Sequence, residues 1–457
     1  MKRFDLIVRG GTVVLPDTVE RLDIGVRDGK IAGLAPGLDP DDAAAAVDAE
    51  GCHVLPGMVD AHVHLNEPGN GHWEGFETGS AALAAGGCTT YIDMPLNGIP
   101  PAVTADALRM KAELARGRSA VDYGFWGGLM PGHVRDLLEL AAAGAVAFKA
   151  FMSDPGGEEE GRFRAVDDWT LYEGMARIAE LGGLLALHAE NDAITSGLAA
   201  RLQAAGCVSA RDYAASRPPE AELEAVHRAL FFAERTGCRV HFVHVSTADA
   251  LIMIDAAKRR GVDASAETCP HYLLLTEEDM ERIGPAAKCA PPLRSDAERE
   301  RMWRMVADGY VDLISSDHSP CPGEWKRLGP GRTFFDIWGG IAAAQCSLEL
   351  MVGEGVRRGL ALSAIAGLLA DGPARRFGLT AKGRIAEGFD ADFAVVDLNR
   401  SYVLRPEHLL QRHKLCPYEG RAIGCKVKET YVRGRLVYAE DRGIAEPGHG
   451  VQVRPSD

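Results

Sequence analysis

In the middle of this chain, the pattern of apolar and polar positions alternates between strand-like and helix-like segments. Short apolar runs of strand length recur, and each is followed by a stretch whose apolar residues have helical spacing. The eight runs are HVLPGMVDAHVH, TTYIDMP, DYGFWGGLM, AVAFKAFM, GLLALHAE, RVHFVHV, VDASAET and VDLISSD. Amphipathic segments such as ALRMKAELARG and ELEAVHRALFFAERTG lie between them. Consecutive strand–helix units of this number predict an α/β fold, namely a (β/α)8 TIM barrel.

The two ends of the chain show a different pattern, in which apolar and polar residues alternate singly. At the start, FDLIVRGGTVV and RLDIGVRDGKIAGLA are interrupted by Arg-Gly-Gly and Arg-Asp-Gly, which favours antiparallel hairpins. GRIAEGFDADFAVVDL and AIGCKVKETYVRGRLVYA near the other end have the same character. We therefore expect one small β-rich domain made of residues 1–55 and 376–457, enclosing a barrel of residues 56–375.

Composition narrows the class of protein. The 457 residues are 46% hydrophobic and carry a formal charge of −15, so the chain lacks the basic face that binding to nucleic acid requires. No apolar run has the length of a signal-peptide core or a membrane span, and we expect no membrane association and a cytoplasmic location. The ten cysteines form no CxxC pair, which indicates reduced, mostly buried thiols, with Cys321 in SSDHSPC as the exception.

Potential metal ligands stand where the predicted barrel strands end. Side chains two apart on a strand point the same way, so a His-x-His pair can hold one ion together. Such a pair ends the first strand, and single histidines or an aspartate end three later ones. Active residues of barrel enzymes lie at these carboxyl ends. The candidate ligands, together with a lysine in the fourth strand, are His62, His64, Lys149, His188, His244 and Asp317.

Lys149 lies within GAVAFKAFM, where an ammonium group would be buried among apolar residues. Burial of an unpaired charge is costly, which favours a modified side chain over a lysine that reaches the barrel rim. Reaction with carbon dioxide would give N6-carboxylysine, a carbamate whose two oxygens can bridge cations about 3.5–4 Å apart. We therefore expect Lys149 to be carboxylated.

Three further histidines are assigned to other roles. His241 and His244 are three apart, so we expect them on opposite faces of a strand and regard His241 as structural. His318 follows Asp317 and should point away from the metals and orient a neighbour. His271 is expected to support or pack against the site, because the other ligands already complete a two-metal centre.

With these motifs in place, the chain resembles the amidohydrolase superfamily, and within it the cyclic amidohydrolases. The resemblance runs from GGTVV through LPGMVDAHVH to GRIAEGFDADFAVVD. It implies a metal-binding barrel with a β-sandwich built from both termini, and a homotetramer. It also implies two divalent ions per subunit on the six candidate ligands. Zinc is the first expectation, and cobalt, manganese or iron also suit this ligand set.

Local stretches narrow the resemblance to the allantoinase family. They are EPGNGHWEGFETG, DMPLN, ETCPHYL and SSDHSPC. Dihydroorotases typically have an arginine two residues after the second histidine for a substrate carboxylate, whereas this chain has Asn66, which carries no charge. Hydantoinases usually have a tyrosine shortly after the metal lysine, and KAFMSDP has none. The resemblance thus implies hydrolysis of a ring amide bond of a small cyclic ureide, allantoin to allantoate.

The expected mechanism uses a hydroxide that bridges the two metals and attacks the ring carbonyl. Asp317 would take the hydroxide's proton and deliver it to the departing ring nitrogen. Candidate substrate contacts lie on loops at the same end of the barrel, although a loop-shaping role is an equal alternative for each. They are Asn97, Cys289, Ser319, Cys321 and Gly339.

Two other functions stay open from sequence. One is a hydantoinase or dihydropyrimidinase, which would open hydantoins or dihydropyrimidines. The other is a non-catalytic relative that keeps the fold as an assembly module. Such relatives usually lack some metal ligands, whereas this chain has all six.

Overall fold

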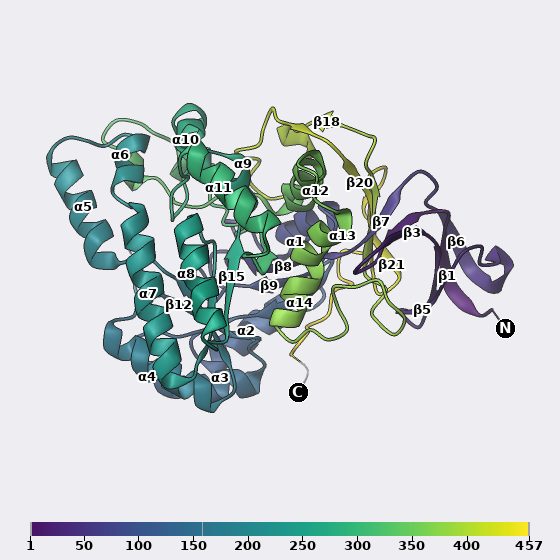
Figure 1. Ribbon diagram of the computed structural model, residues 1–457, viewed down its shortest axis with the longest axis horizontal. Helices are drawn as coiled ribbons and strands as arrows, with labels where there is room; N and C mark the ends of the chain where they lie inside the picture. The colour runs from purple at the N-terminus through teal and green to yellow at the C-terminus, as the bar shows by residue number, and fades with distance from the viewer. Residues whose placement is uncertain (1, 158, 456–457) are drawn as a thin grey trace.

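The computed structural model describes residues 2–157 and 159–455, which form a helix-covered barrel with a strand-rich region at one side (Figure 1). The first described residues lie in the strand-rich region, and the last described residues return to the barrel, below α14 (Gly372–Arg376) in this view. Among the described residues, no helix combines the length and the apolar character that crossing a membrane would require.

The barrel strands pair in parallel in chain order, in one sheet of three strands and one of six. Val63 forms a parallel bridge with His318, so the first strand lies beside the segment after the last one. The strands are β8 (Met58–Val63), β9 (Cys88–Asp93), β10 (Asp122–Phe125), β11 (Gly127–Gly128), β12 (Phe148–Phe151), β13 (Leu184–His188), β14 (Arg239–Phe242), β15 (Ala264–Thr268) and β16 (Leu313–Ile314). The predicted (β/α)8 barrel is confirmed.

The helices surround this ring, with apolar faces turned towards the strands. They are α1 (Phe76–Ala85), α2 (Ala105–Ala115), α3 (Leu137–Ala143), α4 (Asp168–Glu180), α5 (Asp192–Ala204), α6 (Ala210–Ala215), α7 (Pro219–Thr236), α8 (Ala248–Arg259), α9 (Pro270–Leu274), α10 (Glu277–Ile283), α11 (Asp296–Ala307), α12 (Ser347–Arg357), α13 (Leu362–Ala366) and α14. The two segments singled out as amphipathic become α2 and α7.

The first predicted strand run contains two strands that belong to different sheets. HVLPGMVDAHVH is divided at Gly57 into β7 (His53–Pro56) and β8. A Cβ atom at Gly57 would lie 2.2 Å from the side chain of Thr89, so only glycine fits this crossing point. The chain therefore leaves the sandwich and enters the barrel within a few residues.

The sandwich combines strands from both ends of the chain. One sheet has the order β5-β4-β1-β6, and the other has the order β22-β21-β20-β17-β7-β2-β3. The first segment contributes β1 (Phe4–Arg9), β2 (Thr12–Val14), β3 (Val19–Arg21), β4 (Asp23–Arg27), β5 (Lys30–Ala35), β6 (Ala43–Asp48) and β7. The last contributes β17 (Phe393–Asp397), β20 (Lys426–Val432), β21 (Arg435–Ala439) and β22 (Gly443–Ile444), while β18 (Tyr402–Val403) and β19 (Ala422–Ile423) pair separately.

One of the two expected N-terminal hairpins is wrong. β4 and β5 do form an antiparallel hairpin around Asp28 and Gly29, which have φ values of 52° and 75°. β1 and β2, however, lie in different sheets, because the Arg-Gly-Gly stretch carries the chain across the sandwich core. A Cβ at Gly11 would lie 2.8 Å from Val54, which explains a glycine at this crossing.

A buried cluster of charges joins the sandwich to the amino-terminal end of β10. The Lys382 ammonium group lies 2.5 Å from Asp122, 2.9 Å from Asp390 and 2.7 Å from Asp392. The chain end passes the same place, where the backbone N–H of Val453 donates to the carbonyl of Tyr123 (2.8 Å). The last part of segment 376–457 thus runs along the barrel.

Candidate metal centre

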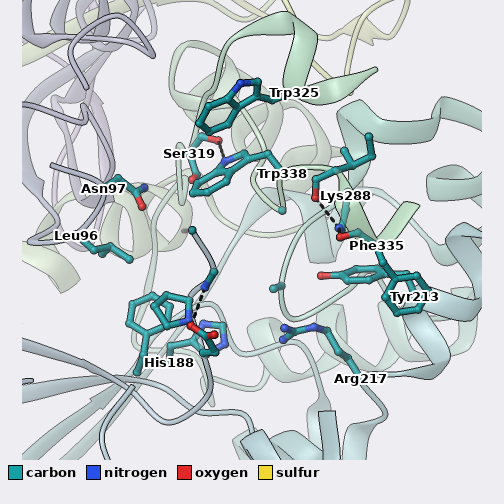
Figure 2. A pocket seen from close by; sticks show the side chains of 18 of the residues that line it. Leu96, Asn97, His188, Tyr213, Arg217, Lys288, Ser319, Trp325, Phe335 and Trp338 are labelled. Atoms are coloured by element: carbon teal, nitrogen blue, oxygen red, sulfur yellow. Dashed lines mark hydrogen bonds between the residues drawn. The ribbon is translucent and has the colours of Figure 1, made fainter. Parts of the chain in front are cut away.

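The carboxyl ends of the barrel strands open into one cavity of about 940 Å³, which is lined by histidines, aromatic side chains and several acidic residues that include Asp317. Figure 2 shows its interior, with His188 at the floor, Asn97 and Leu96 on one side, and Arg217, Tyr213 and Lys288 on the other. Four of the predicted ligands line this cavity directly with their imidazole rings, and Asp317 does so with its carboxylate.

His62, His64 and Asp317 form the tightest group. Their candidate ligand atoms all lie within 4.8 Å of one another. Asp317 Oδ1 is 3.2 Å from His62 Nε2 and 3.3 Å from His64 Nε2. This arrangement of two imidazole nitrogens and a carboxylate oxygen matches the donor set that divalent transition metals prefer.

His188 and His244 form the second group. His188 Nδ1 lies 3.0 Å from His244 Nε2, so the two rings turn these nitrogens towards each other. Phe151 stacks on His188 with ring centroids 4.6 Å apart and an interplanar angle of 12°. Burial lowers the pKa of both histidines, and a neutral imidazole is the form that binds a metal.

Lys149 lies in β12 and is fully buried. Among the described residues, its ammonium nitrogen has no hydrogen-bond partner, and the ring of Phe151 is 5.0 Å away. Burial lowers the pKa of Lys149 to about 7, against the smaller opposing influence of Asp317 and Glu267. An unmodified amine buried without a hydrogen-bond partner is unfavourable. Because five candidate metal ligands lie beside it, this environment suits a lysine that becomes a metal ligand once it is modified.

The backbone is strained at the site. Six described non-glycine residues have a positive φ, and four of them belong to the loops at this end of the barrel: Asn66 (66°), Asn97 (65°), His244 (41°) and Asp317 (48°). Such conformations are unfavourable for residues with a Cβ and persist where the surrounding structure holds them. The strain aims His244 and Asp317 into the cavity after their strands have ended.

Glu267, at the end of β15, is a site residue that the sequence reasoning missed. Its carboxylate accepts hydrogen bonds from His62 Nδ1 (2.8 Å) and His241 Nε2 (3.3 Å). Burial raises the pKa of Glu267, but His62 and His241 outweigh it and bring the value to about 2. The ionised Glu267 therefore fixes the ring of His62 with Nε2 facing Asp317.

Glu190 and Arg217 were also missed. Glu190 is fully buried, and its Oε2 accepts a hydrogen bond from His188 Nε2 (2.8 Å) and another from Arg217. Burial raises the pKa of Glu190, but the charge of Arg217 and the hydrogen bond from His188 outweigh it, and the value is about 2. A glutamate two residues after a strand-ending histidine was the available signal, whereas Arg217 lies in a loop with no motif.

The remaining histidines have other environments. Both ring nitrogens of His241 are hydrogen bonded, one to Ser265 (2.7 Å) and the other to Glu267. The expected separation of His241 and His244 onto opposite faces does not apply, because β14 ends at Phe242 and His244 has a positive φ. His318 Nδ1 accepts from the backbone of Ala343 (3.1 Å) and Ala344.

His271 is fully buried beside Tyr272, with ring centroids 4.3 Å apart. Neither of its ring nitrogens has a hydrogen-bond partner among the described residues.

The candidate substrate residues divide into two groups. Asn97, Ser319 and Gly339 line the cavity, and Asn97 Nδ2 lies 3.4 Å from His64 Nδ1. Cys289 and Cys321 are buried, and neither is among the residues that line this cavity. Asn66 is also buried away from it, and its side chain donates to the carbonyl of Pro320 at 3.4 Å.

The family model and the individual relatives that match this chain agree on one family. Residues 53–437 match the amidohydrolase family. An allantoinase from Bacillus velezensis is 48% identical over 455 residues, covering 99% of this chain and 98% of that protein. An allantoinase from Rubrobacter xylanophilus is 48% identical over 456 residues, covering 100% of this chain and 98% of that protein. An allantoinase from Escherichia coli O1:K1 is 42% identical over 443 residues, covering 96% of both.

Solved structures similar to this chain include hydantoinases and dihydropyrimidinases. The L-hydantoinase (dihydropyrimidinase) from Arthrobacter aurescens has a TM-score of 0.94 at 35% identity and covers 99% of this chain and 100% of that chain. A dihydropyrimidinase from Brevibacillus agri has a TM-score of 0.90 at 31% identity, with 98% of each chain covered.

Proposed function

This chain belongs to the amidohydrolase family, and from that premise we propose that it opens the ring of allantoin by hydrolysis and releases allantoate. The observation that carries the proposal is the complete set of five ligand side chains and one buried lysine at the carboxyl ends of the barrel strands. It stands in a chain whose full length matches curated allantoinases at 42–48% identity.

The residues present fit a centre of two divalent metal ions. The residues that would hold the two ions are the group of His62, His64 and Asp317, the pair of His188 and His244, and a carboxylated Lys149. The support is physical: four imidazoles and the carboxylate of Asp317 face one cavity, and the Lys149 amine is buried without a hydrogen-bond partner among the described residues. When bound, the two cations would supply a Lewis acid for the ring carbonyl and an acidified water as the nucleophile. Zinc remains our first expectation, with cobalt, manganese and iron as alternatives.

Carboxylation of Lys149 follows from its burial. Only a neutral amine adds to carbon dioxide, and the products are a carbamate and a proton. With its pKa lowered to about 7 by burial, Lys149 has a large neutral fraction at neutral pH, unlike an exposed lysine. The carbamate would also replace an unpaired amine by two oxygens that can bind cations.

Asp317 is the proposed general acid and base. Burial raises its pKa, but the neighbouring histidines outweigh this and hold the pKa well below its usual value, so that the carboxylate is ionised at neutral pH. It would accept a proton from the attacking water and transfer it to the ring nitrogen as that nitrogen departs. Asn97, Ser319 and the backbone at Gly339 are placed to orient the ring, since they line the same cavity.

The second candidate function is opening of hydantoins or dihydropyrimidines. It is favoured by the solved structures, which are hydantoinases and dihydropyrimidinases with TM-scores of 0.90–0.94. These are 29–35% identical to this chain, which is less than the allantoinases. We therefore rank it second, and the homotetrameric state and cytoplasmic location inferred from the sequence remain predictions.

A substrate panel tests the proposal. Metal-loaded protein is assayed for ring opening of allantoin, hydantoin and dihydrouracil, with product carboxylate measured directly. We expect the highest kcat/KM for allantoin, and faster turnover of hydantoin would overturn that choice. Asp317→Asn should lower kcat by about 10²–10⁴-fold. Undiminished activity in this variant would refute the assigned proton transfer.

A further inference from the structure

Arg217 stands in the cavity wall but has no role in the mechanism so far. It lies in the short connection between α6 and α7 and lines the cavity together with Tyr213 and Lys288. In Figure 2 its guanidinium group extends from this wall towards His188, across the cavity from Asn97. Arg217 therefore borders the space that a substrate held at the metal centre would occupy.

The position of Arg217 is fixed by its neighbours. Its backbone N–H donates to the carbonyl of Ala214 (3.1 Å), and its carbonyl accepts from Arg294 Nη1 (2.6 Å). The guanidinium carbon lies 5.8 Å from the centre of the Tyr213 ring, and the Tyr213 hydroxyl donates to the carbonyl of Cys289 (3.0 Å). A donor held in this way needs little reorganisation when a ligand binds.

The charge of Arg217 is already balanced. One N–H group donates to Glu190, the buried carboxylate that also holds His188 Nε2. Among the described residues, no other side-chain hydrogen bond of Arg217 is formed, and the side chain keeps 18% of its surface exposed. A guanidinium group has five N–H donors, so donors remain for a ligand in the cavity. With its charge paired, it is suited to an uncharged carbonyl.

The other basic side chains of this wall already have acceptors. Lys288 Nζ lies within hydrogen-bonding distance of the carbonyls of Phe334 (2.7 Å), Phe335 (3.1 Å) and Ile337 (2.6 Å), and burial lowers the pKa of Lys288 to about 6. Arg332 donates to three carbonyls of its own loop. In the part of the chain that the structure describes, Arg217 is thus the cavity-lining cation with unused donors beside His188.

We propose that Arg217 is a specificity-determining residue, which donates hydrogen bonds to the carbonyl oxygen of the ureido substituent while the ring lies at the metal centre. The inference rests on the proposed function, since allantoin and hydantoin share the ring and differ in this substituent. It assigns the choice between the two substrates to the side of the cavity formed by the α6–α7 connection.

Two substitutions test it. Arg217→Lys keeps a positive charge for Glu190 but loses the planar set of donors, and Arg217→Gln removes the charge. In metal-loaded enzyme, both should raise the KM for allantoin at least about tenfold with a smaller change in kcat, because they remove ground-state and transition-state binding alike. The inhibition constant of hydantoin, measured against allantoin turnover, should change less than twofold.

Glu190→Gln is the matched control, because it disturbs His188 without removing the donors of Arg217. Glu190→Gln should lower the metal content or kcat. It should also raise the KM for allantoin and the inhibition constant of hydantoin by the same factor. Metal content is measured for every variant, so that a loss of metal is not mistaken for a loss of recognition.

Three results would overturn the role of Arg217. The first is an allantoin KM within twofold of wild type in fully metal-loaded Arg217→Lys. The second is an equal rise in the KM for allantoin and the inhibition constant of hydantoin, which would make Arg217 a positioning residue acting through Glu190. The third is an unchanged KM with a lower kcat. Failure of the proposed function is distinguishable, because wild-type enzyme would then fail to open allantoin.

Discussion

Two buried lysines, one in a barrel strand and one in the segment that joins the sandwich to the barrel, have opposite surroundings. Lys382 contacts three carboxylates at the amino-terminal end of β10, and although burial lowers its pKa, Asp392, Asp122 and Asp390 outweigh this and raise it. Lys149 lies in β12, near the proposed metal ligands, without a hydrogen-bond partner among the described residues, and burial lowers its pKa to about 7. The first is held as an ammonium ion, and the second is available as a neutral amine.

The difference shows that burial alone does not define a reactive lysine. A buried ammonium ion is stable where its donors meet enough anionic acceptors, and it then serves to join segments. A buried amine that meets none is costly and becomes chemically useful where a small reagent can convert it into a ligand. Removing Lys149 should therefore lower activity and stabilise the metal-free protein, whereas removing Lys382 should lower stability and leave the metal centre able to load.

The largest effect is expected from Lys149→Ala. Without the proposed carbamate, the centre would have one ligand group fewer to hold metal, and kcat/KM for allantoin should fall at least about a thousandfold, because bound metal ions supply several kcal/mol of transition-state stabilisation. Activity and metal content by elemental analysis are measured on the same samples. A short-chain carboxylic acid added to Lys149→Ala should restore part of both, since its carboxylate can occupy the vacated space. A variant with wild-type activity would refute the carbamate.

Lys382→Met should have the next largest effect, on stability. Removing this ammonium ion leaves three carboxylates close together and buried, which should lower the free energy of unfolding by about 3–5 kcal/mol. Chemical denaturation followed by circular dichroism measures the change, and the metal centre should still load. Asp392→Asn should be less harmful in the Lys382→Met background than in wild type, because it removes part of the repulsion. A loss below about 1 kcal/mol would mean that water or protonation already relieves the cluster.

The sequence predicted Lys149 but gave no sign of Lys382. Lys149 stands out because its neighbours in GAVAFKAFM are apolar, which is a local property. Lys382 lies in a glycine-containing loop, and the carboxylates that surround it come from positions 122, 390 and 392, of which the first is remote in sequence. Partners brought together by tertiary structure leave no pattern along the chain.

The same dependence on tertiary structure explains why the sequence indicated the proposed metal ligands but not the residues that hydrogen bond to them. Strand ends of a barrel converge by topology, so strand periodicity was enough to group His62, His188 and Asp317. Glu267 and Arg217 were missed because their roles depend on which side chains face them across the cavity. The β1–β2 link shows the limit for the fold: Arg-Gly-Gly is a good turn, but packing sends its two strands into different sheets.

Lys149→Met should have a smaller effect of opposite sign on metal-free protein. The folded pKa of about 7 lies below the usual 10.5, so between these values the unfolded chain binds a proton that the folded protein does not. The stability of the wild type therefore rises with pH across this window, and its penalty is fully present below pH 7. In buffer without carbon dioxide, Lys149→Met should be more stable by about 1–3 kcal/mol near pH 7.

That advantage should shrink as the pH rises towards 10.5. Thermal unfolding midpoints of both proteins over this range, recorded with a chelator present, provide the measurement. An advantage that grows with pH would mean that Lys149 is charged and paired in the folded protein, in the manner of Lys382.

Lys30→Met should have the smallest effect and sharpens the comparison, because Lys30 shares Asp390 with Lys382. Its ammonium group lies 2.6 Å from Asp390 Oδ1, but 46% of the side chain is exposed. Screened pairs of this kind contribute about 0–1 kcal/mol, and Asp390 keeps Lys382 at 2.9 Å. The loss of stability should thus be below about 1 kcal/mol in wild type. It should be larger in Lys382→Met, where Lys30 becomes the remaining cation beside Asp390 among the described residues. Equal losses in the two backgrounds would show that the exposed lysine and the buried one act independently on their common carboxylate.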